Sequence, residues 1–532
     1  MTQTYDVIVI GSGNAGFSAA SSALDHGAAR VLLVEKAPPQ WAGGNSAFTA
    51  GAYRTVFHGL DDVLPLVENV SVETAKQIDM APYTEADFRG DLDRMTSGRA
   101  DAELVSALVG ESNETTKWLA KNGVRFQLSF NRQAYQIDGR YKFWGGMVLS
   151  VVDGGKGLIQ QHTANAKRKG VEIRYDSPVV KLLTRDTSAG AGPEVVGVTV
   201  RDLVANCTYD VHARGGVVLA AGGFESSPQL RAQYLGPGWD LAYVRGTPHN
   251  TGDLLRLAID EVGAAAAGHW SGCHSTCWDA NAPRNAGDLV LTNQFTKSGY
   301  PLGVMVNVEG ERFVDEGEDM RNFTYAKFGR AVLGQPEGVA WQVWDREGAG
   351  WLREEEYGEG VVEKVWGESM EELAEKMRAG GFRGAKALVE GVREYNEAVT
   401  AFRRENPDVK FDPSKKDGLS TRSSSGGLRL DKTNWATPIT KGPFLAVKIA
   451  CGITFTFGGL KIDPGNAAVI SQASGRPIPG LYCTGEMVGG LFYGNYPGGS
   501  GLTSGAVFGR KSGRAAAQRS QQLREALLKS QL

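Results

Sequence analysis

The sequence predicts an α/β protein, and three patterns in its 532 residues support this class. A β-branched run at residues 7–10 ends in a glycine-rich turn, which is followed by small residues typical of a helix over 15–24. A second strand is expected at residues 30–34. Near the other end of the chain, a strand expected at 459–462 is followed by further glycine-rich segments. Strand, helix and strand in this order are typical of a βαβ unit.

The glycine-rich turn has the spacing of a dinucleotide-binding site. Gly11 suits a tight turn, Gly13 leaves room for a pyrophosphate, and Gly16 allows the helix to pack closely on the strand. The phosphates of such a ligand lie at the positively polarised N-terminus of the helix. Glu35 ends the second strand, where this arrangement needs an acceptor for ribose hydroxyls.

The charge balance restricts the partners of the chain. The formal net charge is -3 and no long basic run is present, so neither a nucleic acid nor an anionic membrane is expected as a partner. No apolar run reaches about eighteen residues, so no direct membrane insertion is predicted. We therefore expect a small-molecule substrate.

The five cysteines are an odd number, which fits a reducing compartment better than a disulfide framework. Cys273 and Cys277 flank His274, but no second cluster has the spacing of a zinc site, so no metal is expected. The first strand begins close to Met1 and leaves no room for a cleaved signal, which favours a cytoplasmic location. The final Ser-Gln-Leu, residues 530–532, resembles a peroxisomal address and gives the alternative location.

Composition changes near residue 249, and the patterns on either side differ. The first part reads as helical over 84–122 and 154–170, with strands at 171–175, 178–183 and 215–221. The middle part has charged helices at 369–378 and 386–402, the first with a predicted capping box of Ser369 and Glu372, and an exposed loop at 413–427. The predicted domains are a cofactor domain made of residues 1–249 and 436–532 and an inserted domain of residues 250–435.

Six motifs, in this order, resemble the fumarate reductase and succinate dehydrogenase flavoprotein family. They are GSGNAG, GGNS, VVLAAGGF, VNVEGERF, PGLYCTGE and SGLTSGAVFGR. Within this family, RGTPHN, CHSTCWDA, DEGED and CGITFTFGGLKID resemble FAD-dependent tricarballylate dehydrogenases. The resemblance implies a discontinuous Rossmann-like FAD-binding domain with an inserted α+β capping domain, and an oxidoreductase acting on CH–CH groups.

The resemblance also assigns residues to FAD. Glu35 is expected at the adenosine ribose, Val179 beside the adenine, Asn45 and Ser46 near the isoalloxazine and ribityl chain, and Glu486 on the ribityl side. Asn45 stands where members with covalently bound flavin carry a histidine, so non-covalent FAD is implied. The full set expected to bind FAD is Gly11, Gly13, Asn14, Ala15, Gly16, Glu35, Lys36, Gly44, Asn45, Ser46, Val179, Ala221, Gly222, Asp253, Glu486, Ser500, Gly501 and Leu502.

In this family, hydride moves between a substrate carbon and flavin N5, and an arginine relays the proton. Alignment of VNVEGERF places the relay position at Met320, one residue before Arg321, so Arg321 is a candidate without a clean match. Tyr325 is a second candidate for the proton acceptor, because a phenolate can form beside a cation.

Two expected contacts to a dicarboxylate are replaced. The histidine that precedes Met-Gly-Gly in fumarate reductases is Phe455 here, and the arginine of their NRLGG is Tyr496 in NYPGG. Fumarate reduction is therefore not expected. His274, Arg245 and Arg321 remain as positively charged or polar candidates for a tricarboxylate. NYPGG also resembles 3-ketosteroid dehydrogenases, whose tyrosines activate a ketone.

Each of these catalytic candidates also has a purely structural interpretation. A buried histidine needs only a hydrogen bond, an arginine beside a carboxylate forms an ordinary surface ion pair, and a tyrosine near glycine turns often only packs.

Three functions remain open. The first is a dehydrogenase of a small polycarboxylate, of the type that converts tricarballylate to cis-aconitate. The second is a dehydrogenase of a ketone-activated ring or a secondary metabolite, and the third is a flavoprotein electron carrier without its own substrate. The chain has no set of cysteines for an iron–sulfur cluster, so the electron acceptor is expected to be a separate protein or oxygen.

Overall fold

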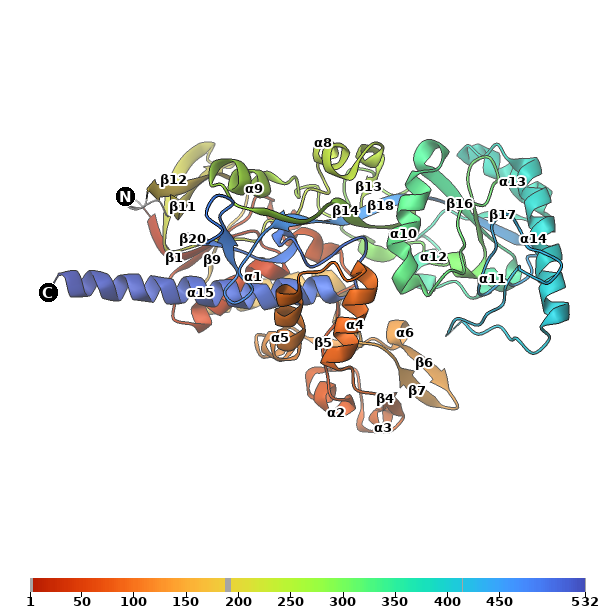
Figure 1. The fold of residues 1–532 in the computed structure, drawn as a ribbon, viewed down its shortest axis with the longest axis horizontal. Helices are drawn as coiled ribbons and strands as arrows, with labels where there is room; N and C mark the ends of the chain where they lie inside the picture. The colour runs from red at the N-terminus through yellow and green to blue at the C-terminus, as the bar shows by residue number, and fades with distance from the viewer. Residues whose placement is uncertain (1–2, 187–192, 414, 532) are drawn as a thin grey trace. The chain divides into compact units, whose positions relative to one another are not determined.

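The computed structural model describes residues 3–186, 193–413 and 415–531 (Figure 1). Its internal contacts divide the chain into two compact units. The first unit is Met1–Leu235, Gly246–His274 and Phe455–Leu532, and the second is Gly236–Arg245 and Ser275–Thr454. The domain boundaries derived from the sequence stay a prediction, because units defined by contacts need not end where sequence composition changes.

The first unit contains an eight-stranded sheet, and this sheet together with the helices of the unit confirms the predicted α/β class. The first strand pairs in parallel with a strand on each side. Parallel sheets have both faces covered by other elements, and accordingly Val7, Ile8 and Val9 are 0% exposed. The path through the sheet is β10-β11-β12-β1-β2-β9, with β20 and β19 attached through β12. The strands are β1 (Gln3–Ile10), β2 (Val31–Val34), β9 (Glu172–Arg174), β10 (Val179–Asp186), β11 (Pro193–Asp202), β12 (Cys207–Leu219), β19 (Ala468–Ile470) and β20 (Pro477–Cys483).

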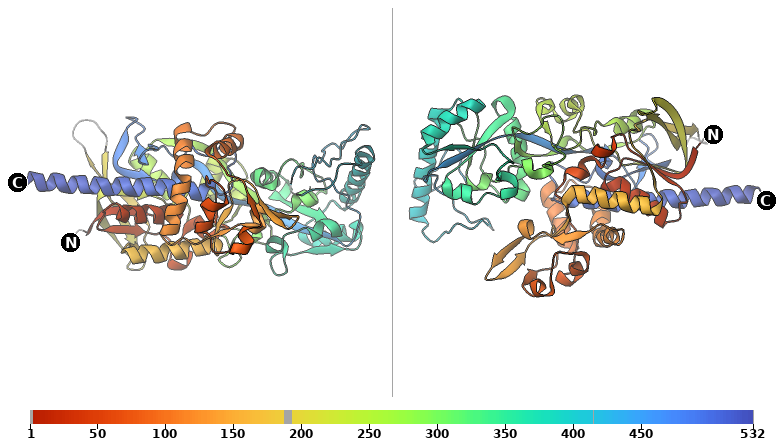
Figure 2. Two further views of the ribbon diagram at one scale, coloured as in Figure 1. Left: turned by 90° about the horizontal axis from the view of Figure 1, so that it is seen from below. Right: turned by 180° about the vertical axis from the view of Figure 1, so that it is seen from behind.

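Two helices from opposite ends of the chain pack together in this unit. They are α1 (Asn14–Asp25) and α15 (Ser500–Ser530), which run side by side in both views (Figures 1 and 2). A Cβ atom added to Gly513 of α15 would lie 2.1 Å from the carbonyl oxygen of Ala19 in α1. Glycines on α15 therefore let the two backbones approach. A third long helix of the unit is α7 (Gly154–Lys169), as predicted from the sequence.

Asp6 in β1 links the sheet to α15. Its carboxylate accepts hydrogen bonds from the backbone N–H groups of Ala29 and Arg30, at 2.8 and 2.9 Å, and from Ser520 Oγ at 2.7 Å. Arg524 forms an ion pair with it. Burial raises the pKa of Asp6, but the hydrogen bonds from Arg524, Ser520 and the backbone outweigh burial and lower that pKa to about 2.

The segment predicted to be helical over residues 84–122 forms two helices. Ser97 has a positive φ of 55° and ends the first of them, so the predicted stretch is interrupted. Short elements and two small three-stranded sheets surround this helical pair. The elements of this part are α2 (Leu60–Val63), α3 (Val72–Ala75), α4 (Glu85–Thr96), α5 (Ala102–Lys121), α6 (Phe130–Gln133), β3 (Ala52–Tyr53), β4 (Ile78–Met80), β5 (Phe126–Leu128), β6 (Ala134–Ile137), β7 (Arg140–Phe143) and β8 (Leu149–Val151), with α8 (Pro228–Leu230) and α9 (Asp253–Arg256) later in the unit.

The second unit contains most of a six-stranded sheet. Two of its strands, β14 (Ala266–Asp279) and β18 (Phe444–Leu460), also contribute residues to the first unit. The strand predicted at 459–462 is thus the end of a longer strand. The remaining elements are β13 (Tyr243–Val244), β15 (Val304–Val306), β16 (Val339–Trp344), β17 (Val365–Gly367), α10 (Arg321–Leu333), α11 (Arg346–Gly350), α12 (Glu354–Tyr357), α13 (Met370–Met377) and α14 (Ala385–Glu405).

The second charged helix has an apolar face, because Leu388, Val392, Tyr395 and Val399 of α14 are buried in one core cluster. The predicted capping box of α13 forms only in part. Ser369 Oγ accepts a hydrogen bond from the N–H of Glu372, whereas the Glu372 carboxylate accepts from the N–H of Glu368. Within the described part of the chain, no helix combines the length and the apolar character that a membrane crossing requires.

The contact between α1 and α15 can be tested with two glycine substitutions. Gly513→Ala places a methyl group against a backbone carbonyl and should destabilise the protein by about 1–3 kcal/mol. The control is Gly110→Ala on the exposed face of α5, where an added Cβ meets nothing within 4 Å, and it should be neutral or stabilising. The measurement is the thermal unfolding midpoint. Equal midpoints for the two variants would contradict the close helix contact.

Asp6→Asn tests the link between β1 and α15. The pKa of Asp6 is about 2 in the folded state, below the value of about 3.9 for an unfolded aspartate. Its contribution of roughly 2–3 kcal/mol is therefore fully present above pH 4 and is lost as the pH falls towards 2. The variant should be less stable at neutral pH and lose less stability between pH 4 and 2, as measured by urea unfolding. Identical pH profiles would show that the contacts of Asp6 are dispensable.

Candidate functional site

The glycines of the first turn differ in the space that the protein leaves for a side chain. A Cβ on Gly11, whose φ is +106°, would lie 2.3 Å from Ala220 O, and a Cβ on Gly16 would lie 1.9 Å from Gly11 O. A Cβ on Gly13 would meet nothing closer than Ser46 Oγ at 3.5 Å. Packing within the protein thus accounts for Gly11 and Gly16. The space beside Gly13 is the room that a bound pyrophosphate needs.

Glu35 lies next to this turn and is 7% exposed. One carboxylate oxygen, Oε2, accepts hydrogen bonds from Ser12 N at 2.9 Å and Ser12 Oγ at 2.5 Å, and Oε1 accepts from Ala37 N at 2.8 Å. These bonds fix the carboxylate, and each of its oxygens has lone pairs to accept further donors such as ribose hydroxyls. Sequence reasoning did not single out Ser12, although it lies inside the GxGxxG motif.

The N-terminal ends of α1 and α15 are joined by Asn14. Its Nδ2 donates to the carbonyl oxygen of Leu502 at 2.8 Å, and its backbone N–H donates to Ser46 Oγ at 3.1 Å. The first N–H groups of a helix have no partner within the helix, and they carry the positive end of its dipole. The N-termini of α1 and α15, together with the hydroxyl of Ser46, are therefore suited to bind an anionic ligand. The predicted residues Ser500, Gly501 and Leu502 form the first turn of α15.

Asn45 connects three segments of the first unit. Its Oδ1 accepts from Thr247 N at 2.9 Å, and its Nδ2 donates to Glu225 Oε1 at 2.6 Å. Gly44, just before it, has a φ of +54° and open space within 4 Å of an added Cβ. Glu225 was not among the residues predicted from the sequence.

The remaining predicted cofactor residues lie in the same unit. Lys36 Nζ donates to Thr251 Oγ1 at 2.6 Å and forms an ion pair with Asp253 at 2.7 Å. Glu486, in the short 3-10 helix Gly485–Met487, accepts from Thr456 N at 2.8 Å. The others are Val179, 5% exposed at the start of β10, Ala221 and Gly222 directly after β12, and Ala15 in the first turn of α1. Their contacts with FAD stay a prediction.

An aromatic cluster surrounds two of the predicted substrate residues. The ring of Tyr496 lies 4.9 Å from that of His274 and 4.8 Å from that of Phe455, both edge-on. Phe492 lies against both Tyr496 and Phe455, with ring centroids 5.6 and 6.0 Å away. His274 and Tyr496, predicted separately from the sequence, are therefore neighbours in the first unit. Phe492 was missed, although it belongs to the same glycine- and aromatic-rich segment.

The other predicted substrate residues belong to the second unit. Arg245 lies over the ring of Trp278, 5.2 Å from its centroid, and its Nη1 donates to Thr454 Oγ1 at 3.0 Å. Arg321 begins α10, and its Nη1 donates to Ser298 Oγ at 3.4 Å. Tyr325 follows four residues later on the same helix, so it shares a face with Arg321.

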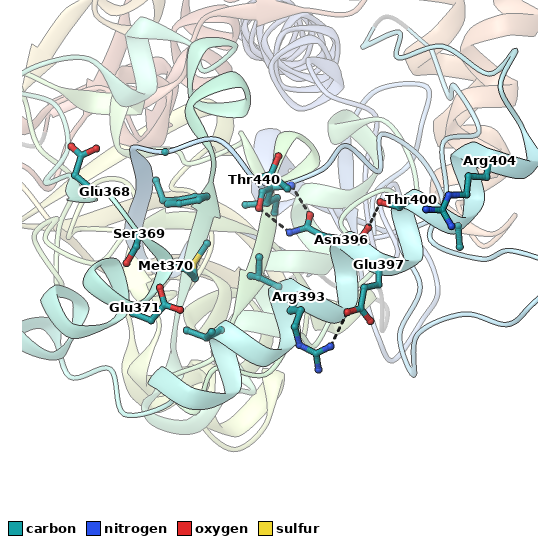
Figure 3. Close-up of a pocket in the computed structure, with 16 residues that line it drawn as sticks. Glu368, Ser369, Met370, Glu371, Arg393, Asn396, Glu397, Thr400, Arg404 and Thr440 are labelled. Carbon is teal, nitrogen blue, oxygen red and sulfur yellow. Dashed lines mark hydrogen bonds and ion pairs between the residues drawn. The ribbon is translucent and has the colours of Figure 1, made fainter.

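A surface pocket in the second unit contains none of these residues (Figure 3). It is lined by α14, the start of α13 and the segment around Thr440. Asn396 there accepts from Ile439 N at 2.7 Å and donates to Ile439 O at 2.9 Å, and Arg393 pairs with Glu397. In the described ranges, no group of three or more His, Cys, Asp or Glu side chains is arranged to hold a metal ion.

Comparisons with known proteins support a flavin cofactor for this chain. The family described as FAD binding domain matches residues 6–502. The probable fumarate reductase Ifc3 of Shewanella frigidimarina is 28% identical over 528 residues, covering 97% of this chain and 75% of that protein. A 4-oxocyclohexanecarboxylate 2-dehydrogenase of Sinomonas cyclohexanicum is 26% identical over 571 residues, covering 95% and 91%.

Among solved structures, the open conformation of a flavocytochrome c3 fumarate reductase is similar with a TM-score of 0.70 and 27% identity. The similarity covers 97% of this chain and 79% of that one. Together with the family match and the geometry of the glycine turn, this identifies the cofactor as FAD.

Gly13→Ala separates cofactor binding from folding. The protein itself leaves room for the added methyl group, so the thermal midpoint of the apoprotein should not change. The methyl group occupies space needed by the pyrophosphate, so the Kd for FAD should rise by about tenfold or more, or about 1.4 kcal/mol. Fluorescence titration of the apoprotein with FAD measures this. A destabilised apoprotein with unchanged FAD affinity would mean that Gly13 serves only the fold.

Proposed function

The chain belongs to the FAD binding domain family, and from this premise we propose that it is an FAD-dependent oxidoreductase acting on a CH–CH group next to a carbonyl. Bound FAD supplies a hydride acceptor at N5. The protein must then orient the substrate, polarise its carbonyl and remove the proton from the neighbouring carbon. Relatives named as fumarate reductases and as a ring-ketone dehydrogenase support this reaction type.

The aromatic cluster around Tyr496 is the observation that favours one substrate class over the other. Phe455 and Tyr496 occupy the two positions where the resemblance to fumarate reductases places carboxylate ligands, and here their rings are in contact. Aromatic faces and edges suit a planar or ring-shaped substrate better than a chain of carboxylates. We therefore favour a ring ketone as the substrate.

In this proposal, Tyr496 donates a hydrogen bond from its hydroxyl to the ketone oxygen. Polarisation of the carbonyl makes the adjacent C–H more acidic, so that its proton leaves to a base as the hydride leaves from the next carbon. His274, edge-on to Tyr496, helps to fix the ring of that tyrosine. Arg321 and Tyr325 stay the predicted proton acceptors.

A small polycarboxylate is the second candidate, with tricarballylate oxidised to cis-aconitate as its prototype. The observation in its favour is the guanidinium group of Arg245, which Thr454 and Asn293 hold in place by accepting its hydrogen bonds. A planar guanidinium binds a carboxylate in a bidentate manner. The motifs shared with tricarballylate dehydrogenases also favour this candidate.

Further parts of the proposal concern FAD attachment, the electron acceptor and the location. Family members with covalently bound flavin carry a histidine where this chain has Asn45. The amide of Asn45 is not a nucleophile, so FAD is held without a covalent bond. Electrons pass on to a separate protein or to oxygen. A cytoplasmic location, with a peroxisomal one as the alternative, rests on the sequence alone, and Leu532 of the terminal tripeptide lies outside the described residues.

Anaerobic reduction of the flavin tests the substrate class. The purified yellow protein is mixed with 4-oxocyclohexanecarboxylate, a 3-ketosteroid, tricarballylate or succinate, and loss of the oxidised flavin absorbance is followed. A ring ketone should bleach the flavin. Tyr496→Phe should slow this by about 10²-fold without loss of bound FAD, because the hydrogen bond to the ketone is removed.

The matched control is Tyr493→Phe, since Tyr493 stacks on His269 at 5.7 Å and is not assigned to the ketone. The ring ketone should reduce the flavin of this variant at the same rate as that of the unsubstituted protein. Bleaching by tricarballylate alone would reject the ring-ketone proposal in favour of the polycarboxylate. A flavin that no compound reduces would argue against both.

A further inference from the structure

Two carboxyl side chains lie together among the predicted flavin residues. Glu225 follows β12 in the sequence GGFE and is 0% exposed, and Glu486 is partly buried. Their carboxyl groups lie close enough to interact with each other. A buried pair of this kind is costly unless its charge is reduced, because two carboxylates repel each other strongly away from water.

The hydrogen bonds show where a proton fits. Glu225 Oε1 accepts from Asn45 Nδ2 and from Asn250 Nδ2, both at 2.6 Å. If both carboxyls were ionised, Glu225 Oε2 would have no donor among the described residues. Glu486 Oε1 already accepts from Thr456 N at 2.8 Å and Thr456 Oγ1 at 3.2 Å. A proton on Glu225 Oε2, donated to Glu486, satisfies both side chains.

Electrostatics favour the same assignment. Burial, followed by repulsion from Glu486, raises the pKa of Glu225 well above its ordinary value, and burial also raises the pKa of Glu486. The nearby cation Arg231 donates from Nη1 to the main-chain oxygen of Glu225 at 2.9 Å. Since the pKa of Glu225 is raised well above its ordinary value, a proton held by the pair favours Glu225 over Glu486.

The backbone is shaped around these side chains. A Cβ on Gly223 would lie 2.1 Å from Glu486 Oε1, and a Cβ on Gly222 would lie 2.4 Å from Asn250 Nδ2. A Cβ on Gly246 would lie 1.9 Å from Asn45 Oδ1. Three glycines from two separate segments thus leave room for one hydrogen-bonded network.

We propose that Glu225 is a positioning residue for the flavin, which holds one proton between itself and Glu486 and thereby fixes the amide of Asn45. The Oδ1 atom of Asn45 accepts from Thr247 N, so its Nδ2 is directed at Glu225. Asn45 and Glu486 are the residues proposed to contact the isoalloxazine and ribityl parts of FAD. The inference rests on those FAD contacts and not on the substrate class.

Substitutions of Glu225 test this role. Glu225→Gln keeps an acceptor for the two asparagines and an N–H donor towards Glu486, so its FAD Kd should stay within about twofold of that of the unsubstituted protein. Glu225→Ala removes both functions and should raise the Kd by about tenfold or more. A Glu225→Gln variant that binds FAD as weakly as Glu225→Ala would overturn the proposal, because Glu225 would then be required as an anion.

Infrared spectroscopy of the apoprotein at neutral pH provides a readout independent of activity and of substrate. A protonated carboxyl group gives a C=O stretching band that shifts in D₂O, and this band should be present in the unsubstituted protein and absent in Glu225→Gln. The control is Glu68→Gln, whose carboxylate is exposed and paired with Arg125, and which should keep the band. Persistence of the band in Glu225→Gln would place the proton elsewhere and overturn the proposal, even if Glu225→Ala does not fold.

Discussion

The close contact between α1 and α15 is the constraint on which the flavin site depends. Gly509 and Gly513 of α15 lie against the backbone of α1, and no larger residue fits there without moving one helix. The contact places Leu502 within reach of Asn14, so the N-termini of the two helices lie close together. The predicted cofactor residues therefore come from distant parts of the chain, and helix packing fixes their geometry.

The predicted functional residues divide by chemistry between the two units. The first unit contributes a neutral aromatic surface around Tyr496 and a network of amides and carboxyls around Glu225. The second unit contributes the guanidinium groups of Arg245 and Arg321. The two units therefore offer different chemistry, with aromatic and amide groups in the first and cationic groups in the second.

The sequence predicted those features that local patterns encode. The glycine turn, the first strands and α7 follow from spacing and apolar runs within short windows. Glu225 could not be predicted in the same way, because its partners Asn45 and Asn250 become neighbours only in the folded chain. The break at Ser97 was missed because a non-glycine residue adopts a positive φ there. The ends of the inserted unit fall inside β14 and β18, where no loop or change of composition marks them.

The position of α15 has a consequence for the order of synthesis. A ribosome releases β1 and α1 first, and the face of α1 that meets α15 has no partner until the last helix has emerged. Residues 275–454 are complete before that point, so the second unit can acquire its core while the first is unfinished. Because the predicted FAD residues Ser500, Gly501 and Leu502 begin α15, a chain truncated before that helix would lack part of the predicted flavin site.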